Sequence, residues 1–158
     1  MTSTAERYRT YQGPALFSMG FRPFFLLAAL WAALAVPIWV AAGFNGWLPA
    51  EHFNRDWHAH EMVFGYLSGV IAGFLLTAVP NWTGRLPVTG APLMALVTLW
   101  CAGRVAMLAP DFVLAPVFDA SFLFVFALVI GREIIAGRNV RNIPVLALLC
   151  VLATANLL

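Results

Sequence analysis

The chain has 158 residues, of which 62% are hydrophobic and only 10% are charged, and its formal net charge is +2. Soluble domains are roughly half apolar and about a quarter charged, so this composition excludes an ordinary soluble domain and indicates an integral membrane protein. The arginines form no clustered basic patch, which argues against nucleic acid as a partner.

Long apolar runs predict an all-α fold, because crossing a bilayer core of about 30 Å takes about 20 residues of helix. Four runs are long enough for complete spans and a fifth is still apolar at the last residue; together they cover about 24–43, 62–79, 93–108, 113–131 and 143–158. An open sheet would leave backbone groups unpaired in lipid. We therefore expect a polytopic transmembrane helical bundle with four complete spans and a truncated fifth. Residues 1–158 would be the N-terminal part of a single polytopic membrane domain, with the lipid bilayer and missing C-terminal spans of the same protein as its partners.

The basic residues, all of them arginines, predict the orientation of these spans. Seven lie on one side of the expected bundle and only Arg55 lies in the loops of the other; the seven are Arg7, Arg9, Arg22, Arg85, Arg132, Arg138 and Arg141. Because basic residues concentrate in cytoplasmic loops, the N-terminus is expected in the cytoplasm. In a bacterial inner (plasma) membrane, the start of the second span would then face the periplasm.

The segment Trp57-His58-Ala59-His60-Glu61 runs directly into the second span. Ionisable groups at the mouth of a span are costly to keep there, so by default they mark a ligand, ion or cofactor site. Two histidines separated by one residue do not bind one ion from the same helix face, in contrast to a pair four residues apart. Glu61 could accept a hydrogen bond from either imidazole and orient it. A solvated histidine cluster at the membrane interface is the alternative.

Within the second span, Gly65, Gly69 and Gly73 recur at intervals of four, so one ridge of the helix carries no bulky side chain. A ridge of small residues is a common interface with a neighbouring membrane helix. It could also accept a flat macrocycle, and the two interpretations can hold along different parts of one helix.

A second pair of ionisable residues lies deeper in the expected bundle. Arg104 stands near the end of the third span and Asp119 near the start of the fourth, so an antiparallel hairpin places them at similar depth. Because an unpaired charge in the membrane is costly, we expect a mutual ion pair. A proton or anion path is the alternative.

Several motifs, in order over residues 20–105, closely resemble the NnrS family. They are Gly20-Phe21-Arg22-Pro23-Phe24-Phe25 at the first span, Trp57-His58-Ala59-His60-Glu61-Met62 and Phe64-Gly65 at the second, Ala72-Gly73-Phe74-Leu75-Leu76-Thr77-Ala78-Val79-Pro80-Asn81-Trp82-Thr83-Gly84-Arg85 at its end, and Trp100-Cys101-Ala102-Gly103-Arg104 in the third. From residue 106 onward the expectations rest on hydropathy alone.

The resemblance implies a multi-pass inner-membrane protein that contains haem and copper and is associated with denitrification and resistance to nitric oxide (nitrosative stress). By this route His58 and His60 become candidate ligands for haem or copper, Met62 a further metal ligand, Glu61 an orienting acid, and the glycine ridge a surface for the planar ring. Direct turnover of nitric oxide, its removal from iron centres and cofactor handling all stay open, so no enzyme activity is assigned. The rival interpretation is a segment of a membrane transporter or scaffold with no redox cofactor.

Overall fold

The computed structural model describes residues 10–46, 48–109 and 111–157, and within these ranges the regular elements are all helical. This confirms the all-α prediction. The arginines at positions 7 and 9, which entered the orientation argument, and the last residue of the fifth expected span lie outside the described residues.

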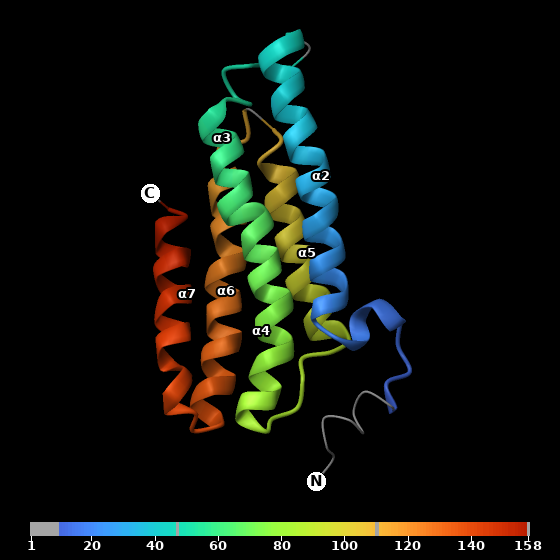
Figure 1. Ribbon diagram of the computed structural model, residues 1–158, viewed down its shortest axis with the longest axis vertical. Coiled ribbons are helices and arrows are strands. Elements are labelled where there is room, and N and C mark those ends of the chain that lie inside the picture. Colours follow the sequence, from blue (N-terminus) through green and yellow to red (C-terminus); the bar gives the residue numbers. More distant parts are fainter. Residues whose placement is uncertain (1–9, 47, 110, 158) are drawn as a thin grey trace.

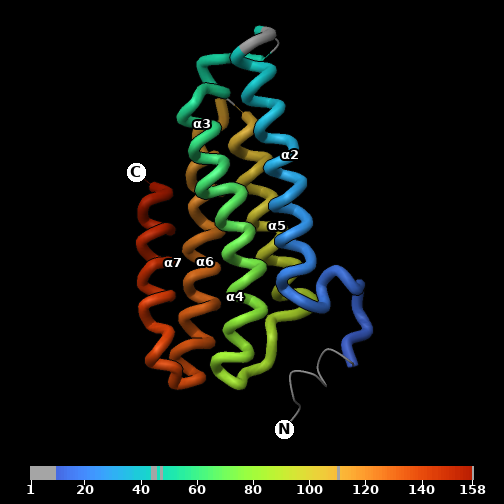
Figure 2. The backbone as a smooth tube through the Cα atoms, viewed as in Figure 1, coloured from blue at the N-terminus to red at the C-terminus, as the bar shows by residue number. Residues whose placement is uncertain are grey.

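The long helices lie side by side and alternate in direction along the chain, as Figures 1 and 2 show. They are α2 (Phe21–Asn45), α4 (Ser68–Thr83), α5 (Ala91–Ala106), α6 (Ala115–Ala136) and α7 (Ile143–Ala155), and a short helix α3 (Arg55–His60) leads into α4. Short 3₁₀ turns η1 (Ala15–Ser18) and η3 (Val140–Asn142) precede α2 and α7. Each expected apolar run corresponds to one long helix, although the helix ends differ by a few residues.

The histidine motif lies inside a continuous helical rod, because α3 passes through the π-helical segment η2 (Glu61–Leu67) directly into α4. Asn54 caps the start of the rod: its side-chain oxygen accepts hydrogen bonds from the backbone N–H groups of Asp56 and Trp57 at 2.8 and 2.9 Å. Gly84 ends the rod with a left-handed φ of 67°. The expected start at residue 62 was therefore late, because hydropathy detects only the apolar part of a helix whose first turns are polar.

Within the part of the chain that the structure describes, two helices are long and apolar enough to cross a membrane, namely Phe21–Gly43 and Arg55–Thr83. Two further apolar helices, Ala91–Ala106 and Val140–Ala155, are shorter. At a rise of 1.5 Å per residue, the 16 residues of α5 span about 24 Å, less than a bilayer core of about 30 Å. The number of four complete spans thus stays a prediction, whereas the helical bundle is observed.

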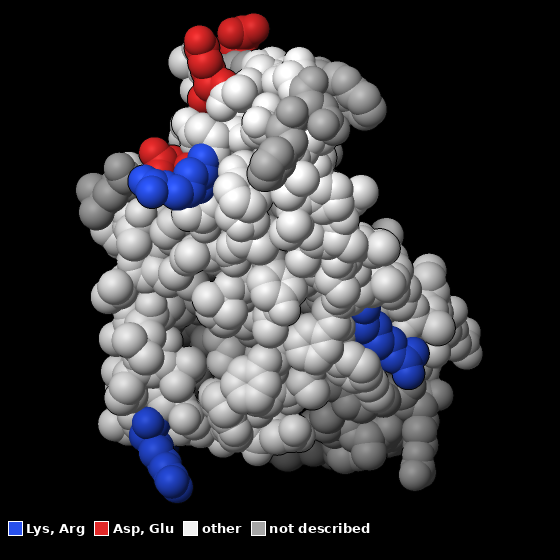
Figure 3. Space-filling model, turned by 45° about the horizontal axis from the view of Figure 1, so that its top comes forward, with Lys and Arg blue, Asp and Glu red and all other residues white. Residues whose placement is uncertain are grey.

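The outer faces of the bundle are apolar. Figure 3 shows a broad surface free of charged side chains between charged groups at its two ends. On α2, for example, Leu26, Leu30 and Leu34 recur on one face and are each at least half exposed. The interior is filled by large apolar side chains from several helices, among them Phe24, Leu93, Leu123 and Phe126, all fully buried.

Candidate functional site

A buried ion cluster lies among α3, η2, α5 and α6; it consists of Glu61, Arg104, Asp119 and His60. The side chains of Glu61, Arg104 and Asp119 are only 0%, 4% and 1% exposed. Arg104 donates a hydrogen bond through Nη1 to Glu61 Oε2, and its Nη2 forms an ion pair with Asp119 Oδ1. The expected pairing of Arg104 with Asp119 is confirmed. The sequence did not indicate that Glu61 shares the same guanidinium.

Two tryptophans enclose the guanidinium of Arg104. Its central carbon lies 5.9 Å from the ring centres of both Trp31 and Trp100, within the range of a cation–π interaction. Trp31 also donates its indole N–H to Glu61 Oε2 at 2.8 Å. Trp100 donates its indole N–H to the carbonyl of Gly65 at 3.1 Å. The indoles thus supply polar contacts at their N–H groups and an apolar wall elsewhere, which suits a cluster that is shielded from water.

His60 connects the cluster to the end of the bundle at which α3 begins. Its Nδ1 lies 3.2 Å from Glu61 Oε1, so Glu61 does orient an imidazole as the sequence suggested. Its Nε2 lies 3.0 Å from Asn156 Oδ1 and 3.2 Å from Asp119 Oδ2. The side chain is 24% exposed, far more than those of the other three residues of the cluster. No sequence signal pointed to Asn156, which follows the last turn of α7.

His58 lies in different surroundings. Its ring stacks on Trp39 of α2 with 4.2 Å between ring centres and an angle of 12°. Its Nδ1 is buried and has no hydrogen-bond partner among the described residues. His52 lies in the loop before α3, and its Nε2 is 3.0 Å from the carbonyl oxygen of Met107, just after α5. The two histidines of the motif therefore lie in different environments. This agrees with the expectation that histidines separated by one residue do not face the same site.

The glycine ridge is filled by side chains from α2 and α5. A Cβ added to Gly69 would lie 3.1 Å from the Cβ of Ala28 and 3.4 Å from Trp100, and one added to Gly73 would lie 2.6 Å from Phe25. At Gly65 the nearest groups are Arg104, Glu61 and Trp31. This arrangement agrees with the helix-packing interpretation of the ridge. A planar ring on the same face would have to displace these side chains.

Haem and copper require side chains with a free lone pair that are directed at the bound group. The described residues contain no group of three or more His, Cys, Asp or Glu side chains that could hold a metal ion. Both ring nitrogens of His60 lie within hydrogen-bond distance of oxygen atoms, so a metal bound there would displace Glu61, Asp119 or Asn156 from the imidazole. Met62 is only partly buried and packs against the apolar core. The described residues thus show no preformed cluster of metal ligands, whereas His58 Nδ1 is a buried imidazole nitrogen without a partner, and the assignment of His58, His60 and Met62 as ligands stays a prediction.

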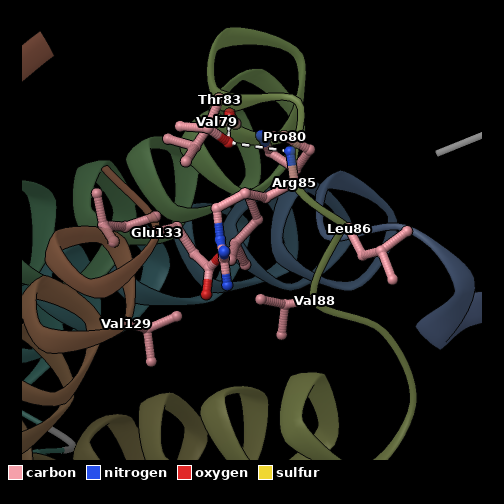
Figure 4. A pocket seen from close by; sticks show the side chains of 10 residues that line it. Val79, Pro80, Thr83, Arg85, Leu86, Val88, Val129 and Glu133 are labelled. Atoms are coloured by element: carbon pink, nitrogen blue, oxygen red, sulfur yellow. Dashed lines mark hydrogen bonds and ion pairs between the residues drawn. The ribbon is translucent and has the colours of Figure 1, made fainter. Parts of the chain in front are cut away.

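A second ion pair closes the opposite end of the bundle. Arg85, just after α4, donates from Nε to Glu133 Oε2 on α6. Figure 4 shows the two side chains turned toward each other beside a small, mostly apolar cavity. Their side chains are 36% and 13% exposed, so water reaches this pair more readily than the buried ion cluster. The ion pair connects the loop that follows α4 to helix α6, and we interpret its role as structural.

Comparisons with known proteins give one match. The family model described as "NnrS protein" matches residues 15–158. No curated protein and no solved structure matches the chain. The matched range contains the motifs at residues 20–105 and extends over α6 and α7, for which the sequence offered only hydropathy.

Proposed function

Because this chain belongs to the NnrS family, we propose that it acts in resistance to nitric oxide as part of an integral membrane protein that holds haem and copper. The observation that carries this proposal is the family match over residues 15–158. Denitrification, which produces nitric oxide, is the metabolic setting that the resemblance implies.

The proposed location is a bacterial inner membrane, crossed several times. Two long apolar helices among the described residues and the broad uncharged surface in Figure 3 support this location. The excess of arginine at one end of the helices supports a cytoplasmic N-terminus. In this orientation the buried ion cluster lies nearer the periplasmic side, because α3 begins there.

Haem and copper enter the proposal through the family and not through any residue of this chain. His58, whose buried Nδ1 has no hydrogen-bond partner among the described residues, is the residue best placed to hold such a group, which would supply redox chemistry when bound. What the chain's own residues do is hold two carboxylates and a guanidinium in an apolar interior, joined through His60 to the end of the bundle.

The test is a spectroscopic and metal analysis of the purified full-length protein in detergent. A Soret absorption band that survives washing, together with bound copper measured by mass spectrometry, is the expected result. Loss of nitric oxide tolerance in a deletion strain, restored by the wild-type gene, would connect these groups to the proposed role. Absence of both haem and copper from well-folded helical protein would contradict the proposal.

The buried ion cluster favours one alternative, a segment of a membrane transporter or scaffold with no redox cofactor. Charged residues inside a membrane bundle often line ion or proton pathways. A protein that carries no haem or copper but alters the movement of a proton or solute across vesicles would support this alternative.

A further inference from the structure

An apolar groove lies on the outside of the bundle between α4 and α7, both of which pack against α6. Its space of about 550 Å³ includes its open side. The side chains that line it are all apolar, among them Phe74 and Leu75 of α4 and Val145, Leu148 and Leu152 of α7. Lipid tails are as apolar as leucine, so in a bilayer an acyl chain fits such a groove.

The turn between α6 and α7 closes one end of this groove. Figures 1 and 2 show that the turn lies at the same end of the bundle as the end of α4. Asn139 of the turn donates from Nδ2 to the carbonyl oxygen of Trp82 at 2.7 Å. The indole of Trp82 is about one third exposed, and its ring centre lies 6.2 Å from that of Phe74 in the groove. Because tryptophan favours the membrane–water interface, this end of the groove is placed at the level of the lipid headgroups.

Two exposed arginines, Arg138 and Arg141, stand at this end of the groove. Glu133 is the only acidic side chain at this end among the described residues, and its carboxylate pairs with Arg85. Neither Arg138 nor Arg141 has an ion-pair partner within the described part of the chain. The polar end of the groove therefore carries positive charge that no group of this chain neutralises.

Arg138 also occupies a position for which glycine is the usual residue. It follows the last turn of α6 with a left-handed φ of 52°. Its N–H donates to the carbonyl of Ile135, and the N–H of Asn139 donates to that of Ile134, both at 3.0 Å. These two bonds define a Schellman motif, in which a residue with a Cβ has a conformational cost that glycine lacks. The turn gains nothing from arginine here, which points to an interaction of its side chain with a group outside the described residues.

The depth of the groove matches one leaflet of a bilayer. Val145 follows Arg141 by four residues, and Leu152 follows it by eleven, so the lining of α7 runs from about 6 to about 16 Å beyond Arg141. Half of a bilayer core is about 15 Å. A lipid whose phosphate lies at the two arginines therefore has its chains at the level of the groove.

From the groove and the unpaired charge at its end, we propose that this site binds an anionic phospholipid. The phosphate contacts Arg138 and Arg141, and one acyl chain lies between α4 and α7. The inference rests on the membrane location of the proposed function and on neither haem nor copper. Basic groups at the ends of membrane helices contribute about fivefold each to the binding of anionic lipid, so the pair predicts a preference of about 25-fold.

The test is native mass spectrometry of the full-length protein in nanodiscs with equal amounts of phosphatidylglycerol and phosphatidylcholine that have the same chains. We expect the wild type to retain phosphatidylglycerol with the preference given above, and the double variant Arg138→Gly, Arg141→Gln to lose it. Glycine suits the turn at position 138, so this variant keeps the fold. Arg22→Gln is the matched control, because it removes one arginine at the same end of the bundle from α2, away from the groove.

A second pair of variants tests the acyl chain. Val145→Trp fills the end of the groove next to the arginines and should reduce retention of phosphatidylglycerol, whereas Val151→Trp adds the same bulk to a residue of α7 that is 65% exposed and does not line the groove. Unchanged retention in Val145→Trp overturns the inference, as it would if another helix of the full-length protein covered the groove. Displacement of the lipid by an equal concentration of glycerol phosphate also overturns it, because the arginines would then bind a free phosphate.

The same preparation separates this inference from the proposed function. A protein that does not enter the discs contradicts both, since the membrane location is then wrong. A protein that enters them but retains the two lipids equally, or retains phosphatidylglycerol without Arg138 and Arg141, overturns the lipid site alone.

Discussion

Replacing Arg104 tests how much the buried ion cluster contributes to the free energy of unfolding, because its one guanidinium pairs with two buried carboxylates. Replacing it by glutamine leaves Glu61 and Asp119 without their shared cation, in a site where their side chains are 0% and 1% exposed. Removing one partner of a buried ion pair costs about 3–5 kcal/mol, because the remaining charge stays buried. Loss of the cation–π contacts with Trp31 and Trp100 adds to this cost.

Arg85→Gln is the matched control, since it makes the same chemical change in an ion pair that water reaches. The side chains of Arg85 and Glu133 are 36% and 13% exposed, and exposed pairs contribute about 1 kcal/mol or less. Arg104→Gln should therefore lower the free energy of unfolding by at least about 2 kcal/mol more than Arg85→Gln.

Both variants can be compared by reversible unfolding in mixed micelles with a denaturing detergent, followed by tryptophan fluorescence. Helical content by circular dichroism would confirm that each protein starts from the same fold. If Arg104→Gln lost no more stability than Arg85→Gln, the description of the buried ion cluster as a desolvated charge network would be wrong.

Three further changes test the packing around the cluster. Gly65→Ala should destabilise the chain by about 1–3 kcal/mol, because the new methyl group overlaps the cluster, whereas Gly43→Ala in α2, with no atom within 4 Å, should be neutral or slightly stabilising in the same unfolding assay. Gly103→Ala should also be destabilising, because its Cβ would lie 2.9 Å from the backbone of α6; a melting temperature equal to wild type would contradict the close α5–α6 approach. Trp31→Phe should cost about 1.5–3 kcal/mol through loss of the indole hydrogen bond to Glu61, and an unchanged unfolding midpoint would show that this bond contributes nothing.

Hydropathy alone predicted where the helices lie. The expected run at 113–131 corresponds to α6 (Ala115–Ala136), and the run at 24–43 to α2 (Phe21–Asn45). Helix ends were less accurate, because capping groups such as Asn54 extend a helix beyond its apolar part. The polar pair Arg104–Asp119 could be predicted because a short hairpin fixes the relative depth of neighbouring helices.

The remainder of the cluster depended on tertiary structure. Glu61 meets Arg104 across two elements that are distant in sequence, and the rod changes to a π-helix at Glu61, so rotations of 100° per residue do not apply there. Asn156 reaches His60 only because α7 packs beside α6, which no periodicity in either segment indicates. The glycine ridge was correctly recognised as a close-approach surface, although its pattern did not identify the side chains that fill it.

The order of charges along the chain has a consequence for biosynthesis. Glu61 leaves the ribosome before Arg104, which follows 43 residues later. At translation rates of about 5–20 residues per second, this delay lasts about 2–9 seconds. During that interval two groups that contact the Glu61 carboxylate in the folded chain are already synthesised, namely the indole of Trp31 at 2.8 Å and the imidazole of His60 at 3.2 Å. Of the side chains that contact the Glu61 carboxylate in the folded chain, its guanidinium counterion is therefore the last to be synthesised.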